Sequence, residues 1–207
     1  MYSASSFSGE LISMPEVYNL CFELALKIKA ANDFPEVIVA IGRGGFVPAR
    51  FICDFLNISA LTSIKVHHYS HFHRHKTVTI PFPLSGVVKD QKVLVVDDIN
   101  DTGLSLAAAV RHIMSYGPSE IKTAVLHEKD NDNFKVDYCA KYIKKWRWIF
   151  YPWARMEDLG ALLKEMKTMP TTPEKAQEEI KMAYGLQVPI AQIKMVFQLQ
   201  DKSMYKV

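Results

Sequence analysis

The sequence has 207 residues, of which 49% are hydrophobic and 23% are charged, and its formal net charge is +3. This composition is typical of a globular chain with a hydrophobic core, and it excludes a disordered protein. The net charge is too small to indicate nucleic acid as a partner, although it suits a site for anionic small molecules.

The cysteines and the apolar runs bear on the cellular compartment. Cys21, Cys53 and Cys139 lie far apart without C-x-x-C spacing, a pattern that indicates reduced thiols. No Lys or Arg precedes Lys27, so the N-terminus lacks the charged start of a signal peptide. No apolar run approaches the ~18 residues that span a bilayer. We therefore expect a cytoplasmic protein without a membrane partner.

The first two-thirds of the chain alternate between strand and helix patterns. The expected elements are a helix over 17–30, a strand over 36–41, a helix over 46–56, strands over 60–69, 77–82 and 93–96, a helix over 104–117, and strands over 121–129, 136–140 and 146–150. The strand over 77–82 is expected at an edge, because proline cannot donate to a central ladder. The alternation predicts an α/β fold with a mostly parallel central sheet flanked by helices.

The last part of the chain has a different pattern. Residues 156–169, 174–185 and 189–200 have the apolar spacing of amphipathic helices. We expect a domain over 1–155 followed by a helical C-terminal extension over 156–207. The extension packs on its own domain or forms a subunit interface, and a regulatory or nucleic-acid role is a third alternative.

The segment KVLVVDDINDTGLSL (92–106) predicts a ligand site. A buried strand runs into Asp97, Asp98 and Asp101, and open α/β sheets bind ligands at the carboxyl ends of strands. Thr102 and Ser105 add hydroxyls to a loop at a helix N-terminus, where backbone N–H groups bind phosphate. A sugar phosphate reconciles the carboxylates with the phosphate cradle. The plain structural alternative is a strand that ends in a solvated acidic turn.

The string VLVVDDINDTGLSL resembles the signature of the type I phosphoribosyltransferases, which bind 5-phosphoribosyl-1-pyrophosphate (PRPP). The resemblance implies the type I phosphoribosyltransferase fold with a small hood. It implies that Asp97 and Asp98 hold the ribose hydroxyls and that Asp98 holds Mg²⁺. The loop that it implies for the 5′-phosphate consists of Asp101, Thr102, Gly103, Leu104 and Ser105.

A second glycine-rich loop, IGRGG (41–45), lies between a strand and a helix. Alone, such a loop is more often only a turn. Beside the first motif it resembles the pyrophosphate loop of the same family, which implies that Arg43, Gly44 and Gly45 bind PRPP. The planar guanidinium of Arg43 suits phosphate oxygens.

The choice of base is predicted from two later segments. Lys129, which ends the strand VLHEK, and Trp148, in WIFYPW, are similar to the corresponding segments of the xanthine-guanine and hypoxanthine phosphoribosyltransferases. The Lys129 ammonium can donate to O6 of a 6-oxopurine, the Trp148 ring can stack on the base, and main-chain groups near Ile149 can meet its edge. In the structural alternative, Lys129 is a solvated strand end and Trp148 only packs.

Asp101 is the expected catalytic residue. The resemblance places it near N7 of the base, where a carboxylate can act as a general acid–base. It also offsets positive charge on the ribose in the transition state. The structural alternative is a cap on the following helix.

A histidine cluster precedes the expected edge strand, and it consists of His67, His68, His71, His73 and His75. Such a cluster can bind a metal. Its position instead matches the loop that closes over PRPP in the family. Tyr69, Ser70 and Lys76 are candidates for contacts with substrate, although the sequence does not single out one of them.

The expected function is purine salvage. A Mg²⁺-dependent enzyme would join PRPP and a 6-oxopurine (guanine, hypoxanthine or xanthine) into a nucleoside 5′-monophosphate and release pyrophosphate. We expect a homo-oligomer, either a dimer or a tetramer. The alternatives are a phosphoribosyltransferase for another base and a non-catalytic nucleotide-sensing regulator on the same fold.

Overall fold

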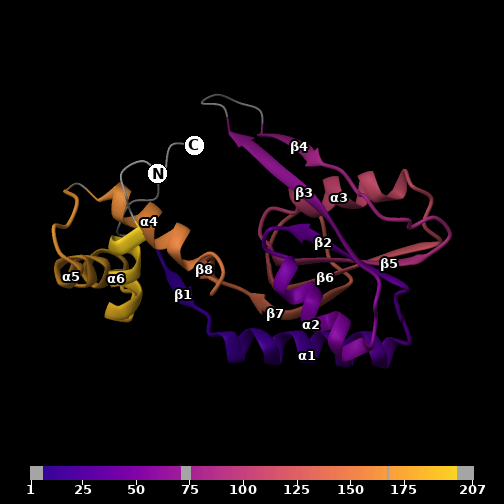
Figure 1. The fold of residues 1–207 in the computed structure, drawn as a ribbon, viewed down its shortest axis with the longest axis horizontal. Helices are drawn as coiled ribbons and strands as arrows, with labels where there is room; N and C mark the ends of the chain where they lie inside the picture. The colour runs from indigo at the N-terminus through magenta and orange to yellow at the C-terminus, as the bar shows by residue number, and fades with distance from the viewer. Residues whose placement is uncertain (1–6, 71–75, 167, 200–207) are drawn as a thin grey trace. The chain divides into compact units, whose positions relative to one another are not determined.

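The computed structural model describes residues 7–70, 76–166 and 168–199 (Figure 1). The chain divides into two compact units, Pro15–Lys144 and Met1–Met14 with Lys145–Val207. We call them the sheet unit and the helical unit. Their positions relative to one another are not determined, so each is described by itself.

The sheet unit contains a six-stranded sheet in the order β4-β3-β2-β5-β6-β7. The strands are β2 (Val37–Gly42), β3 (Leu61–Ser70), β4 (Lys76–Phe82), β5 (Lys92–Asn100), β6 (Glu120–Lys129) and β7 (Tyr138–Ile143). Only the pair of β3 and β4 is antiparallel. The expected mostly parallel sheet is confirmed, and the proline-containing strand β4 lies at its edge.

Helices cover both faces of this sheet, which explains why every residue of β2 is buried. They are α1 (Met14–Ala31), α2 (Phe46–Leu56) and α3 (Leu104–Met114). Figure 1 shows α3 on one side and α1 with α2 on the other. Val37, Val39 and Ile41 share a core cluster with α3. Helix α3 ends at Met114, before the expected end at Gly117, which adopts a φ of 71° in the following turn.

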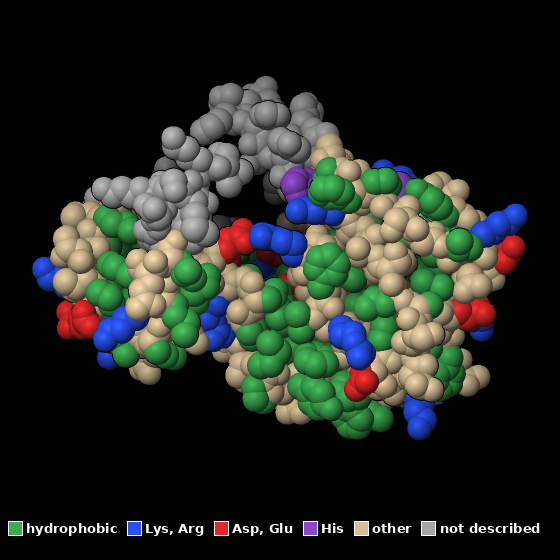
Figure 2. Space-filling model, in the orientation of Figure 1, with side chains coloured by type: hydrophobic (Ala, Val, Ile, Leu, Met, Phe, Trp, Pro, Cys, Tyr) green, Lys and Arg blue, Asp and Glu red, His purple; other side chains and the backbone are tan. Residues whose placement is uncertain are grey.

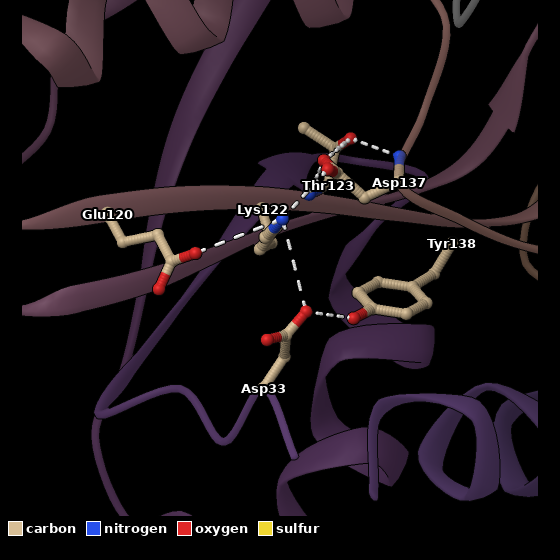
Figure 3. A network of polar contacts seen from close by, with 6 residues as sticks. All are labelled: Asp33, Glu120, Lys122, Thr123, Asp137 and Tyr138. Carbon is tan, nitrogen blue, oxygen red and sulfur yellow. Dashed lines mark hydrogen bonds and ion pairs between the residues drawn. The ribbon is translucent and has the colours of Figure 1, made fainter. Parts of the chain in front are cut away.

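A polar network links β6, β7 and the end of α1 (Figure 3). The Asp137 carboxylate accepts hydrogen bonds from N and Oγ1 of Thr123, both at 2.8 Å, and Lys122 Nζ lies 3.5 Å from the same carboxylate. Tyr138 donates its hydroxyl to Asp33. This network lies in the first half of β6, away from the carboxyl ends of the strands, and it stabilises the pairing of β6 and β7.

The helical unit combines a two-stranded parallel sheet with three helices. Its elements are β1 (Gly9–Leu11), β8 (Trp148–Phe150), α4 (Arg155–Glu165), α5 (Pro173–Tyr184) and α6 (Ile190–Leu199). Strand β1 pairs with β8, and no sequence pattern predicted β1. The three expected helices are present, although α4 ends four residues before the expected end at Met169.

The division of the structure differs from the boundary expected at 155/156. Phe150 is 1% exposed and shares a core cluster with Leu159, Ile180 and Leu186. A side chain on Gly9 would place its Cβ 2.8 Å from the Phe150 ring, so β1 also lies against this core. The C-terminal helices therefore pack on β1 and β8, and residues 145–155 belong to the same compact unit as these helices. Among the described residues, no helix is long and apolar enough to span a bilayer.

Candidate active site

The two predicted phosphate loops follow the carboxyl ends of two central strands of the sheet. Strands β2 and β5 are parallel neighbours with Ala40 opposite Val96, so the loops that follow them emerge side by side. A Cβ on Gly44 would lie 2.4 Å from Oδ2 of Asp98, and a Cβ on Gly45 would lie 2.2 Å from the carbonyl oxygen of Val96. A side chain at Gly45 would collide with backbone atoms, and one at Gly44 would displace the Asp98 carboxylate. The structure therefore brings the two loops together.

The first loop, residues 43–45, leads directly into α2. Gly45 is the N-cap of this helix, and its N–H donates to the Ile41 carbonyl at 2.8 Å. No side chain caps the helix, and the side chain of Arg43 is exposed. The peptide bond between Gly42 and Arg43 is cis. The helix N-terminus and a guanidinium therefore lie at the edge where a pyrophosphate is expected.

Asp97 and Asp98 follow the buried part of β5. Asp97 is 8% exposed, and its Oδ1 accepts a hydrogen bond of 2.9 Å from the Asp98 N–H. Burial and then the charge of Asp98 raise the pKa of Asp97 well above its usual range, although the Asp98 N–H acts in the opposite direction. A ligand that brings hydroxyl donors or a cation to these carboxylates would lower the free-energy cost of ionising Asp97.

The donor set fits Mg²⁺ only with help from a ligand. Within the described ranges, no group of three or more His, Cys, Asp and Glu side chains is arranged to hold a metal ion. Mg²⁺ commonly binds one or two carboxylates and takes its other oxygens from water and substrate phosphates. Asp98 fits this pattern, because its carboxylate lies beside Gly44 of the expected pyrophosphate loop.

Asp101 and Lys129 contact each other. Asn100 of β5 is opposite Glu128 of β6, so the two following residues emerge together. Lys129 is 4% exposed, and its Nζ lies 2.9 Å from Oδ2 of Asp101, whose side chain is 38% exposed. The alternative in which Lys129 is a solvated strand end is therefore wrong. The expected acid–base and the expected base-reading residue form one ion pair, which the sequence did not predict.

The second loop, residues 101–105, precedes α3. Gly103 is the N-cap of α3 with a φ of 77°, and no side chain caps the helix. The alternative role of Asp101 as a helix cap is therefore wrong. Thr102, Leu104 and Ser105 are half-buried around this turn. A helix N-terminus without a side-chain cap suits a phosphate site.

Sequence reasoning missed two asparagines near the second loop. Asn100 is 1% exposed, and its Nδ2 donates to Oε1 of Glu128 at 3.2 Å and to the Phe134 carbonyl at 2.8 Å. Asn133 donates to the Thr102 carbonyl at 2.7 Å. A signal was present in the sequence, because the polar run DNDN directly follows Lys129 at a strand end.

Trp148 and Ile149 belong to the helical unit, whereas Lys129 belongs to the sheet unit. Trp148 is 39% exposed, and its backbone N–H donates to the Ser8 carbonyl at 2.8 Å. Ile149 is 6% exposed. The position of both residues relative to Lys129 is not determined, so their contact with a base stays a prediction.

The histidine cluster is described only in part. His71, His73 and His75 lie outside the described residues. His67 pairs with Thr79 in the ladder of β3 and β4. Ser70 and Lys76 also pair in this ladder, so the strands extend further into the expected loop than the sequence predicted.

The geometry of this site defines a class of protein. Two glycine-containing loops and three carboxylates meet at the carboxyl ends of neighbouring parallel strands, as in α/β proteins that bind phosphorylated sugars or nucleotides. The phosphoribosyl transferase domain family matches residues 8–155. The chain belongs to this family.

Known relatives share most of the chain. A purine phosphoribosyltransferase from Pyrococcus horikoshii is 31% identical, with a TM-score of 0.63 over 70% of this chain and 93% of that chain. A xanthine-guanine phosphoribosyltransferase from Idiomarina loihiensis is 25% identical over 142 residues, which are 69% of this chain and 84% of that protein. A xanthine-guanine-hypoxanthine phosphoribosyltransferase from Helicobacter pylori supports the fold, with 23% identity and a TM-score of 0.63 over 74% of this chain and 99% of that chain.

Proposed function

We propose that the protein is a purine salvage phosphoribosyltransferase. It transfers the phosphoribosyl group of PRPP to a 6-oxopurine (guanine, hypoxanthine or xanthine) and releases pyrophosphate. The buried Lys129 ammonium, 2.9 Å from Asp101 at the phosphate-binding edge of the sheet, carries this proposal. The named activities of the relatives from Pyrococcus horikoshii and Idiomarina loihiensis support it.

PRPP binds across the two loops. Arg43 and the backbone of Gly44 and Gly45 hold the pyrophosphate, and residues 101–105 hold the 5′-phosphate. Asp97 and Asp98 accept hydrogen bonds from the ribose hydroxyls. Asp98 is the residue that would hold Mg²⁺, together with oxygens of PRPP; when bound, the ion offsets the negative charge that develops on the leaving pyrophosphate.

The Lys129–Asp101 ion pair changes partners when the base binds. Lys129 Nζ donates a hydrogen bond to O6 of the purine. Adenine carries an amino group at this position, which cannot accept that hydrogen bond. Asp101 is then able to accept the N7 proton as the bond from N9 to ribose C1′ forms and the bond from C1′ to the pyrophosphate oxygen breaks. Its negative charge also stabilises the positive ribose of the transition state.

The site of action and the assembly are part of the same proposal. The protein acts in the cytoplasm, in agreement with its three free cysteines.

The protein forms a dimer or a tetramer. Hydrophobic side chains gather on the face that carries α1 and α2 (Figure 2), and Tyr18, Phe22 and Leu26 on α1 are 45%, 48% and 49% exposed. Patches of this kind mark interfaces between proteins. Light scattering on the purified protein gives the assembly directly.

The base preference tests the role of Lys129. In Lys129→Met, the methionine fills the space of the lysine without an ammonium. We expect kcat/KM with hypoxanthine to fall about 100-fold, because a buried hydrogen bond from a charged group is lost. The KM for PRPP should change little. An unchanged preference for hypoxanthine over adenine in this variant would remove the assigned role of Lys129.

A further inference from the structure

The segment 130–134, which joins β6 to β7, contacts the expected phosphate loop 101–105. Asn133 Nδ2 donates to the Thr102 carbonyl at 2.7 Å. A Cβ on Gly103 would lie 2.6 Å from Asn131 Oδ1 and 2.7 Å from the Phe134 nitrogen. The segment therefore lies directly against the backbone of the loop, and it leaves no space for a side chain at Gly103.

The segment is itself held at both ends. Asn131 Nδ2 donates to the Lys129 carbonyl at 3.2 Å, and Asn131 Oδ1 accepts from the Phe134 N–H at 3.1 Å. The Phe134 carbonyl accepts from buried Asn100 Nδ2 at 2.8 Å. Asn131 thus fixes the segment to the end of β6, where Lys129 lies, and Asn100 fixes it to the end of β5, which Asp101 directly follows.

One hydrogen bond orients a peptide plane of the loop. In a trans peptide the carbonyl and the following N–H point in opposite directions. The Thr102 carbonyl points toward Asn133, so the Gly103 N–H points away from the segment. A backbone N–H oriented in this way at a helix N-terminus is a donor for phosphate. Without the Asn133 amide, this plane loses the contact that holds its orientation.

We propose that the segment 130–134 positions the phosphate loop, and that Asn133 and Asn131 are positioning residues for the 5′-phosphate of the substrate. This inference rests on the proposed function, because it takes residues 101–105 as the phosphate site. Neither asparagine touches the reacting atoms. Asn133 acts through the Thr102 carbonyl, and Asn131 acts through Gly103 and Lys129.

The test compares guanosine 5′-monophosphate with guanosine, which lacks the phosphate, by calorimetric titration. Asn133→Ala should weaken binding of the nucleotide by about 3- to 10-fold, the usual effect of one lost hydrogen bond, and leave guanosine unchanged. Asn133→Asp keeps the shape but removes the donor, and it should lose at least as much. Asp132→Ala is the matched control, since it truncates an exposed neighbour in the same segment. It should bind both ligands as the wild type does.

Steady-state kinetics and thermal unfolding separate positioning from a structural role. The KM for PRPP should rise in Asn133→Ala by a similar factor, with kcat and the melting temperature near their wild-type values. Equal binding of the nucleotide by wild type and Asn133→Ala would overturn the inference, as would an equal loss for nucleotide and nucleoside. A wild-type protein that binds none of the 5′-monophosphates of guanosine, inosine and xanthosine would instead overturn the proposed function.

Discussion

At the scale of single residues, ionisation of Asp97 costs free energy because this carboxyl is buried beside the charge of Asp98. The raised pKa of Asp97, caused by burial and by Asp98, means that the folded protein holds this proton more tightly than the unfolded chain. The stabilisation from this proton is fully present below the unfolded pKa of about 4 and is lost as the pH rises through the folded pKa. The cost is therefore present at neutral pH, where the site has to bind PRPP.

Replacement of Asp97 by its neutral amide tests this cost. Asp97→Asn should unfold at a higher urea concentration than the wild type at neutral pH, because it removes a buried charge while its Oδ1 can still accept from the Asp98 N–H. The difference should shrink as the pH falls below about 4, where the wild-type carboxyl becomes protonated in both states. Binding of PRPP should become weaker. A variant that is less stable than the wild type at neutral pH would show that burial of Asp97 has little cost.

The residue scale also shows the limit of sequence reasoning. The carboxylates and glycines of both loops follow strands in the sequence, so their place at the sheet edge was predictable. The 2.9 Å contact of Lys129 with Asp101 depends on the register of β5 against β6, which local patterns do not contain. The contacts of Asn131 and Asn133 depend on the same register.

At the scale of elements, the network of β6 and β7 stabilises the sheet far from the site. Burial, followed by the hydrogen bond to Asp33, raises the pKa of Tyr138 to about 12. The folded state therefore favours the neutral phenol. Its contribution to stability is fully present below the unfolded pKa of about 10 and is lost as the pH rises from there toward about 12.

Tyr138→Phe removes this titration and retains the ring. Between about pH 10 and about pH 12, the wild type should lose stability more steeply than the variant, whereas catalytic activity at neutral pH should be the same in both. Denaturant unfolding at several alkaline pH values measures the two slopes. Parallel slopes would show that Tyr138 ionises equally in the folded and unfolded chain.

Elements differ in how well their sequence predicts them. Strand β5 and helix α3 follow from an apolar run and a helical spacing that span many residues. Strand β1 has only the three residues Gly-Glu-Leu, which carry too little pattern to be recognised. It forms because it pairs with β8, which is distant in the sequence.

At the scale of the whole molecule, the sheet unit and the helical unit each contain a hydrophobic core among the described residues. The expected boundary at 155/156 follows a change of pattern along the sequence, whereas the structure places β8 in the core of the C-terminal helices. Phe150 is only 1% exposed there. Local patterns predict amphipathic helices, but they do not show which distant strand covers the apolar faces of these helices.

A chain that ends at residue 155 tests this second core. It lacks α4, α5 and α6, so Phe150 loses Leu159, Ile180 and Leu186 as packing partners. Loss of this burial should cost several kcal/mol at about 25 cal/mol per Å² of apolar surface, and we expect the truncated chain to aggregate or to unfold at a lower temperature. Cooperative unfolding at the wild-type temperature would show that the helices contribute no stability to residues 1–155.

The most direct test of the proposed function is pyrophosphate release with PRPP, Mg²⁺ and one base at a time, namely guanine, hypoxanthine, xanthine, adenine, uracil or orotate. We predict turnover with at least one 6-oxopurine, none with the other three bases, and a loss of about 100-fold or more in kcat for Asp101→Asn. Turnover with only adenine, uracil or orotate would contradict the role of Lys129. Silence with every base, despite measurable binding of PRPP, would contradict the proposed enzyme and favour a nucleotide sensor on the same fold.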